Sequence, residues 1–460
     1  MMLIYDSLSG QKKEFQPITP GQVKMYVCGQ TVYDDCHIGH ARSMIVFDLI
    51  VRYFQYKQFK VTFVRNITDV DDKIIQRANE NKETCDALTA RFIHSMHEDQ
   101  IALNLLSPDV EPRATEFIQP IIILIEKLLS EKIAYIAGNG DICFSVKKFK
   151  DYGKLSKRDV EKLIAGARVD INEGKQDPLD FVLWKLSKPN EPQWDSPWGK
   201  GRPGWHIECS AMAEQILGQP FDIHGGGMDL KFPHHENEIA QSEAANHKTF
   251  ARYWMHVGLL NVNNEKMSKS LKNFFTIKEV LAEYSVEAIR YFMLSAHYRS
   301  PVNYSKDNLL LAHQALVRLY TALRGLDLSD AALHDRSFEE KFSQAMDDDF
   351  NSPVALSVLF DMTHEINRLR QENKLAEASL LGAQLKKWGV VFGILQTDPE
   401  IFLRGDSDHA FSEKVEALIA DRNAARHTKN WNEADRIRTL LTEMNVVIED
   451  GGDGTTWRRA

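Results

Sequence analysis

The segment Tyr26–Arg42 constrains this chain more than any other, because a strand pattern ends and a helix pattern begins within it. Residues 23–27 alternate apolar and polar and include β-branched and aromatic side chains, as strands do. Apolar residues recur at helical spacing over 41–56, and residues 60–64 have the pattern of a second strand. This order predicts a βαβ unit, and open parallel sheets bind ligands at the carboxyl ends of such strands.

The end of this segment, His37-Ile38-Gly39-His40, places two imidazoles about one turn apart at the predicted helix start. A helix N-terminus offers unpaired N–H groups and a partial positive charge, which suit phosphate. Gly39 lets a ligand approach the backbone closely. The imidazoles add hydrogen-bond donors that can stabilise charge as it develops on a phosphorus centre. The pattern alone is also compatible with a plain helix start that carries surface histidines.

A second motif lies far downstream, at Lys266-Met267-Ser268-Lys269-Ser270. A lysine pair on a loop is usually solvated charge, but both motifs in this order favour nucleotide chemistry. With both signatures intact, the chain resembles the class I aminoacyl-tRNA synthetases. More narrowly, it resembles the cysteinyl-tRNA synthetase family over essentially all 460 residues.

The resemblance implies an α/β fold with further domains. It comprises a Rossmann-like parallel-sheet catalytic domain split by a connective insertion, an all-α anticodon-stem-binding bundle and a small C-terminal anticodon-binding domain. The expected limits are 1–85 for the first catalytic half, 86–178 for the insertion, 179–300 for the second catalytic half with the metal site and lysine motif, 301–394 for the bundle, and 395–460 for a linker and the small domain.

Local patterns give finer expectations. The pattern is helical from Asp86 to Ile136, and Asp180–Lys185 is expected to be the strand with which the catalytic sheet resumes. Residues 396–408 have the composition of a linker. Beyond Ser300, helices are expected at Leu309–Leu326, Phe338–Ala345, Pro353–Arg370, Leu375–Trp388, Ser412–His427 and Trp431–Met444, with strands only at 446–450 and 454–459.

Composition excludes several classes of protein. The first residues lack a basic stretch, so no signal peptide is expected, and the aliphatic run Ile121–Ile125 is too short to span a bilayer. Five cysteines, an odd and sparse set, argue against a disulfide framework and fit a reducing cytoplasm. The net charge of −9 gives no support to nucleic-acid binding, so a tRNA partner rests on the motifs. A monomer is the default expectation.

Four residues form a candidate zinc set of sulfur, nitrogen and oxygen donors: Cys28, Cys209, His234 and Glu238. No CxxC pair is present, and a His-x-x-x-Glu helix face, here after Pro233, is more often a surface pair than a metal site. The resemblance implies that these four bind one zinc ion per chain and that the substrate thiolate joins them. Zinc prefers sulfur to a hydroxyl, whereas an apolar pocket would discriminate cysteine from serine only about 10–200-fold. We therefore expect zinc to be the specificity element.

The resemblance also implies the remaining binding residues. Those expected at the amino-acid pocket are Gly29, Thr31, Thr68, Trp205, His206 and His224. Those expected to bind ATP, which carries Mg²⁺, are His37, Gly39, His40, Gly226, Gly227, Asp229 and Lys269, with Asp229 reaching the ribose. The residues alone leave alternatives open, because Trp205, His206 and His224 could be core residues and the glycine run after residue 224 could be a flexible turn.

The implied reaction has two steps: cysteine and ATP give cysteinyl-adenylate and pyrophosphate, and the terminal ribose of tRNA(Cys) then takes the cysteinyl group. His37 and His40 would stabilise charge near the α-phosphate, while Lys266 and Lys269 would neutralise the pyrophosphate. The insertion is too small for the editing domain of synthetases for branched aliphatic amino acids, so we expect no editing.

Three alternatives remain: a cysteine ligase of the mycothiol-synthesis type, a non-catalytic paralogue that binds zinc or tRNA, and a small-metabolite nucleotidyltransferase. The first lacks a full anticodon region, so the segment Ser412–Arg459 argues against it. Within that segment Arg422 and Arg426 could contact RNA or form a solvated face. Trp431 and Trp457 could stack on bases, although core packing is the expectation for both.

Overall fold

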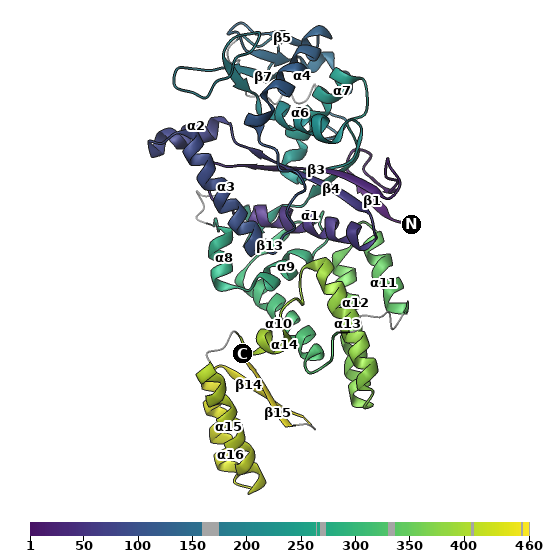
Figure 1. Ribbon diagram of the computed structural model, residues 1–460, viewed down its shortest axis with the longest axis vertical. Helices are drawn as coiled ribbons and strands as arrows, with labels where there is room; N and C mark the ends of the chain where they lie inside the picture. Colours follow the sequence, from purple (N-terminus) through teal and green to yellow (C-terminus); the bar gives the residue numbers. More distant parts are fainter. Residues whose placement is uncertain are drawn as a thin grey trace. The chain divides into compact units, whose positions relative to one another are not determined.

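The computed structural model describes residues 1–158, 174–263, 265–266, 273–329, 336–405, 409–451 and 454–459. These fall into two compact units (Figure 1). The first comprises Met1–Leu309 and Lys341–Ala355, and the second comprises Leu310–Glu340 and Leu356–Ala460.

A four-stranded parallel sheet forms the centre of the first unit. Its order is β10 (Ala251–Val257), β9 (Phe221–Gly227), β3 (Gln22–Thr31) and β4 (Lys60–Thr68), and each neighbouring pair is parallel. The helix α1 (Ile38–Tyr56) connects β3 to β4 and lies along the sheet (Figure 1). The βαβ unit predicted from the sequence is therefore present, and the Rossmann-like α/β class is confirmed.

A second, antiparallel sheet lies in the upper part of Figure 1, with the order β5 (Ala134–Ile136), β6 (Ile142–Phe144), β7 (Phe181–Leu186) and β8 (Gly201–Pro203). It shares a hydrophobic core with α4 (Ile118–Ser130), α6 (Trp205–Leu217) and α7 (His234–Asn246). The strand expected at Asp180–Lys185 is therefore real, but it pairs with β6 and β8 and does not resume the parallel sheet. A short apolar strand fits the pattern of either sheet, and only its partners decide between them.

The rest of the first unit consists of short elements around these sheets. A hairpin joins β1 (Leu3–Asp6) to β2 (Gln11–Glu14), and a three-stranded sheet has the order β12 (Glu265–Lys266), β11 (Leu260–Val262) and β13 (Val302–Tyr304). The sequence analysis missed β13, whose three residues are too few to show an alternation. The other helices of this unit are α2 (Asp72–Asn81), α3 (Cys85–Ala102), α8 (Ile277–Glu283), α9 (Val286–Leu294) and most of α11 (Arg336–Asp347).

The second unit is mainly helical. It includes most of two helices, α10 (Lys306–Leu323) and α12 (Ser352–Gln371). The helices α13 (Leu375–Phe392), α14 (Pro399–Arg404), α15 (His409–His427) and α16 (Trp431–Glu443) follow. The chain then forms a hairpin of β14 (Val446–Gly451) and β15 (Gly454–Arg459). The presence of α14 corrects the linker expectation, because Asp398 caps this helix and Pro399 begins it. None of the described helices is both long and apolar enough to cross a membrane.

The glycine run does not form the turn that the sequence suggested, because Gly225, Gly226 and Gly227 are the last residues of strand β9. Gly225 faces Phe47 of α1, and a Cβ atom there would lie 2.3 Å from Cζ of that ring. Phe47 is fully buried. Glycine is therefore needed at this position because the helix packs directly on the strand, and the close packing holds α1 against the sheet edge.

We expect Gly225→Ala to lower the free energy of unfolding by about 1–3 kcal/mol, because the added methyl group overlaps the Phe47 ring. Chemical denaturation would measure the change. Phe47→Leu in the same background should recover part of the loss, since the smaller side chain makes room. An alanine variant as stable as the wild type would contradict the packing argument.

Candidate functional site

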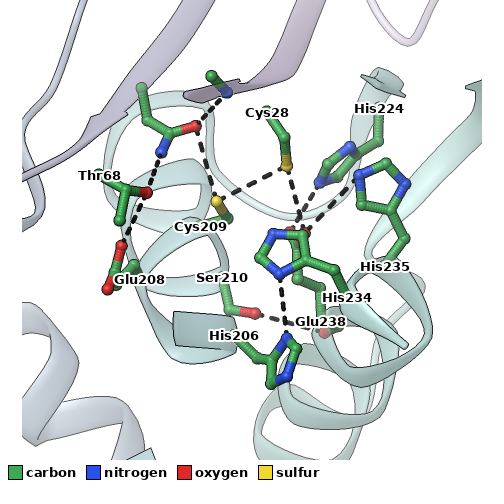
Figure 2. Close-up of polar contacts among 12 residues, drawn as sticks. Cys28, Thr68, His206, Glu208, Cys209, Ser210, His224, His234, His235 and Glu238 are labelled. Carbon is green, nitrogen blue, oxygen red and sulfur yellow. Dashed lines mark hydrogen bonds and ion pairs between the residues drawn. The ribbon is translucent and has the colours of Figure 1, made fainter. Parts of the chain in front are cut away.

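Four candidate metal ligands meet beside the carboxyl ends of the parallel strands (Figure 2). They come from three elements, with Cys28 on β3, Cys209 on α6, and His234 and Glu238 on α7. One potential ligand atom from each lies within 4.8 Å of all the others. The sulfur atoms of Cys28 and Cys209 are 3.6 Å apart, and Nε2 of His234 lies 3.0 Å from Oε1 of Glu238. The structure thus brings together all four residues proposed as zinc ligands.

Local structure explains how each ligand reaches the cluster. His234 and Glu238 are one helical turn apart on α7, so their side chains share a face. The pairing of β3 with β4 shifts register between Val27 and Gln30, and Cys28 lies in this irregular stretch. The neighbouring residue must be small, because a Cβ atom on Gly29 would lie 1.6 Å from the carbonyl oxygen of Asn66.

The cluster is buried, and its groups strongly perturb one another. Burial would raise the pKa of the Cys209 thiol, but the hydrogen bond from Cys28 and the contact with His234 outweigh this and lower it to about 6. For the thiol of Cys28, burial and the neighbouring Cys209 raise the pKa well above its usual value. Burial would lower the pKa of His234, but Glu238 raises it to about 10.

This electrostatic arrangement fits a divalent metal ion. One thiol is poised as a thiolate beside a carboxylate, while Cys28 and His234 hold protons that a metal could replace. Two sulfur donors, one imidazole and one carboxylate are the ligand types that zinc accepts in proteins. The residues present therefore fit a zinc ion.

A second layer of side chains orients these ligands. Nδ1 of His206 lies 3.0 Å from Nδ1 of His234, and the Trp205 ring stacks on the His234 ring with centroids 4.4 Å apart. Nε2 of His224 lies 2.8 Å from Oε2 of Glu238. Partners of this kind fix the ring orientation and tautomer of metal ligands. Three predicted pocket residues thus contact the cluster directly.

Sequence reasoning missed several members of the site. His235 forms a second candidate ligand set with Cys28, His224 and Glu238, which overlaps the first. Nδ1 of His235 lies 2.9 Å from Nε2 of His256, whose Nδ1 lies 2.8 Å from the hydroxyl of Ser7. Only the adjacency of His235 to a proposed ligand could have indicated it, and nothing local singles out Ser7 or His256.

A cavity of about 300 Å³ lies next to the cluster and could receive a small substrate. Its wall includes Val70, Asp71, Phe181, Arg202, Trp205 and His206. The predicted pocket residue Thr68 ends strand β4, where it pairs in register with Thr31 of β3. The backbone N–H of Gly29 donates to Oδ1 of Asn66 at 2.9 Å. Of the predicted substrate residues, only Trp205 and His206 are in the wall of this cavity, whereas Gly29, Thr31 and Thr68 lie at the strand ends.

The first signature forms an unusual helix cap. His37 is the N-cap of α1, and its Nδ1 accepts hydrogen bonds from the backbone N–H groups of Gly39 and His40, at 3.1 and 3.3 Å. Nδ1 of His40 accepts from the backbone N–H of His37 at 3.2 Å. Because Nδ1 is the acceptor in both rings, the neutral rings carry their proton on Nε2. Desolvation and the neighbouring His37 lower the pKa of His40 well below its usual value.

The flanks of the two signatures pair with each other. The backbone N–H of Ile38 donates to the carbonyl of Phe275 at 3.0 Å, and that of Ile277 donates to the carbonyl of Cys36 at 2.9 Å. The segment that follows the lysine motif therefore lies beside the histidines. Lys266 belongs to β12, but its side chain and all of Lys269 lie outside the described residues.

The residues proposed for ATP lie at the end of β9 and just beyond it. Gly226 and Gly227 end that strand, and Asp229 follows in a short 3₁₀ helix over Met228–Lys231, with its side chain exposed. A Cβ atom on Gly226 would lie 2.9 Å from Cε1 of His235. The strand end is thus closely packed on α7 and leaves Asp229 accessible to a ligand.

In the small C-terminal domain, the prediction for one tryptophan is confirmed and that for the other is wrong. Trp457 is fully buried in the core of this domain, as expected, with its Nε1 donating to Glu416 at 2.8 Å. Trp431 is 59% exposed, so the expectation that it packs in the core is wrong. Arg422 and Arg426 both bind the carboxylate of Asp450, and Arg422 does so with two hydrogen bonds at 2.8 and 2.9 Å. Arg422 is therefore part of the domain's internal structure.

Three family models together match most of the chain. The class I (C) tRNA synthetase catalytic domain matches residues 14–314, the DALR domain matches 341–396, and the cysteinyl-tRNA ligase anticodon-binding domain matches 408–458.

Relatives match the chain from end to end. A cysteine–tRNA ligase of Coxiella burnetii (strain Dugway 5J108-111) is 58% identical over 460 residues, covering 100% of both chains. Another, of Vibrio vulnificus (strain YJ016), is 59% identical over 461 residues, again covering 100% of both. This chain belongs to the cysteine–tRNA ligase family. The recognition made from its two signatures is confirmed, and the chain is a class I aminoacyl-tRNA synthetase.

Solved structures support the fold of this synthetase. The methionyl-tRNA synthetase of Mycobacterium tuberculosis in complex with methionyl-adenylate has a TM-score of 0.59 at 16% identity, and the match covers 81% of this chain and 90% of that one. A leucyl-tRNA synthetase of Agrobacterium radiobacter K84, in a ternary complex, has a TM-score of 0.58 at 11% identity and covers 85% of each chain. At such identities the likeness establishes the class I fold alone.

We expect Cys209→Ser to weaken metal binding by more than the roughly 10–100-fold typical of outer partners, because it removes a buried sulfur donor. Elemental analysis and chelator competition on the purified protein would measure the loss. Cys85→Ser is the matched control, since Cys85 begins α3 and belongs to neither candidate ligand set. Equal metal content in the wild type and the Cys209 variant would contradict the assignment.

Proposed function

We propose that this protein ligates L-cysteine to tRNA(Cys) in two steps through a cysteinyl-adenylate. The observation that carries the proposal is the buried cluster of Cys28, Cys209, His234 and Glu238 beside a small cavity at the strand ends. A metal ion held by this cluster would bind the thiol group of a substrate. The full-length likeness to proteins named cysteine–tRNA ligase supports the same reaction.

The four cluster residues would hold a zinc ion, which when bound supplies a Lewis acid that prefers a thiolate to a hydroxyl. The first set is favoured over the overlapping set with His224 and His235, because it has two sulfur donors. His224 and His206 then act as the outer partners of Glu238 and His234. Selection by sulfur would let the enzyme exclude serine without an editing site.

The two histidines of the first signature would act on the nucleotide. Their Nε2–H groups are neutral donors held at a helix N-terminus, where backbone N–H groups also favour phosphate. They would bind the α-phosphate as the cysteine carboxylate displaces pyrophosphate from it. Lys266 and Lys269 would balance the charge of the departing pyrophosphate, together with Mg²⁺, while Asp229 binds the ribose.

Transfer to tRNA rests on the C-terminal matches. The DALR domain and the cysteinyl-tRNA ligase anticodon-binding domain match residues 341–396 and 408–458, a region that a mycothiol-type ligase would not need. The exposed ring of Trp431 is available to stack on an RNA base. These features favour tRNA as the acceptor of the activated cysteine.

ATP–pyrophosphate exchange with cysteine or serine, before and after metal removal, tests the proposal. We expect exchange with cysteine alone, lost on chelation and restored by zinc. Exchange with neither amino acid would contradict the activation step. Equal exchange with serine would leave the synthetase assignment standing and overturn metal-based selection of the thiol.

We expect Lys269→Ala to slow adenylate formation by about 100-fold or more, because a charge that stabilises the leaving pyrophosphate is lost. Single-turnover adenylate formation would measure the rate, and elemental analysis should find the metal content unchanged. Lys272→Ala, outside the signature, is the matched control. An unimpaired rate in the Lys269 variant would remove this residue from the mechanism.

A further inference from the structure

Within the second compact unit, helix α14 connects the helical bundle (α10, α12 and α13) to the small C-terminal domain (α15, α16, β14 and β15). This connection is docked on the bundle by specific contacts. The ring of Phe402 on α14 stacks on the ring of Tyr320 on α10, with centroids 4.0 Å apart. The hydroxyl of Tyr320 also accepts a hydrogen bond from the backbone N–H of Thr397 at 3.1 Å. The segment between the two parts is therefore fixed to α10 along its length.

Arg324, which directly follows α10, contacts both α14 and the small domain. Its Nε and Nη2 donate to the two carboxylate oxygens of Glu400 on α14, at 2.6 and 2.9 Å. Nη2 also donates to the backbone carbonyl of Trp457 on β15 at 2.8 Å. A guanidinium carries five N–H donors in one plane, so it can bind a carboxylate at two points and still reach a third acceptor. The side chain of Arg324 thus ties α10 to α14 and to β15.

Burial and geometry distinguish this ion pair from ordinary surface pairs. Exposed pairs contribute little, because solvent screens them and because two mobile side chains must be ordered. The side chain of Arg324 is only 10% exposed, and its contact with the carboxylate is bidentate. Its backbone is held as well, since Arg370 of α12 donates to the carbonyl of Ala322 at 3.1 Å and to that of Arg324. The guanidinium is therefore presented from a fixed helix end, and its contacts define one orientation.

The acceptor on β15 belongs to the packed core of the small domain. Trp457 is fully buried there, and its Nε1 donates to Glu416 of α15. Arg404, the last residue of α14, forms an ion pair with the same carboxylate at 3.3 Å, and its guanidinium carbon lies 5.0 Å from the centroid of the Trp457 ring. A hydrogen bond from Arg324 to this tryptophan therefore acts on the domain as a whole.

We propose that Arg324 is a positioning residue that fixes the small C-terminal domain on the helical bundle, so that one tRNA molecule can contact both. This inference rests on the proposed function, in which tRNA is the acceptor. The DALR domain and the anticodon-binding domain match the chain on the two sides of α14. Two RNA-binding surfaces held in one arrangement bind a single RNA more tightly than the same surfaces on a loose tether, because less freedom is lost on binding.

Arg324→Met tests the inference, because methionine keeps an apolar stem and removes every hydrogen bond of the guanidinium. We expect the KM for tRNA in cysteine ligation to rise about tenfold, while ATP–pyrophosphate exchange, measured without tRNA, stays unchanged. Binding of a short RNA hairpin that carries only the anticodon loop, measured by fluorescence anisotropy, should also stay unchanged, because the small domain keeps its own fold. Arg368→Met is the matched control, since the partners of Arg368, Glu365 and Glu372, lie on its own helix.

Glu400→Gln keeps the test decisive if the Arg324 variant folds poorly. This variant should raise the KM for tRNA less, because the bond from Arg324 to the Trp457 carbonyl remains, and the double variant should match Arg324→Met, because the two side chains act as one pair.

Several results would overturn the inference. They are an unchanged KM in the Arg324 variant, an equal rise in the Arg368 control, additive losses in the double variant, and loss of hairpin binding in the Arg324 variant, which would indicate that the small domain unfolds. A wild-type protein that does not bind the hairpin would overturn it too, since the small domain would then offer no surface to position. A wild-type protein that does not charge tRNA with cysteine would instead refute the proposed function.

Discussion

Two thiols, one carboxylate and one imidazole are buried together, and three elements of the first compact unit hold them in place. Without solvent, neighbouring thiols and a carboxylate cannot all ionise, and the opposite pKa shifts of Cys28 and Cys209 express this conflict. A divalent cation would resolve this conflict. The ligands come from β3, α6 and α7, so occupancy of the site would also tie three separate elements together.

The parallel sheet gives this cluster its place. Strands β3, β4 and β9 end at one edge, where Cys28, Thr68 and the glycines of β9 lie. Close approach is possible because Gly29 abuts the backbone of Asn66 and Gly225 abuts Phe47. Glycine therefore serves packing here, with no left-handed backbone involved. The same edge that positions the sulfur donors also sets the starting point of α1, and with it the two histidines.

Much of the fold could be predicted from the sequence, whereas only some members of the candidate site could be. The βαβ unit and long helices follow from periodicity, whereas the four candidate ligands were proposed from the resemblance, since no CxxC spacing marks them. The partner strands of β7 could not be predicted, because a short apolar strand suits either sheet. Asn66 carries no local signal, because its contacts with Gly29 and Cys209 join residues that are distant in sequence. The placement of Lys269 lies outside the described residues.

The helix cap at His37 explains why the histidine signature alone would not suffice for the proposed formation of an adenylate. The rings of His37 and His40 stack with centroids 3.6 Å apart, a distance at which two protonated imidazoles would repel strongly. Desolvation lowers the pKa of His40, and backbone N–H groups occupy Nδ1 of both rings. The pair is thus suited to donate hydrogen bonds as neutral groups. Neutral donors can orient a phosphate but cannot balance the charge of departing pyrophosphate. In the proposed reaction Lys266 and Lys269 would balance that charge, and the pairing of residues 36–38 with 275–277 places the segment that follows the lysine motif beside the histidines.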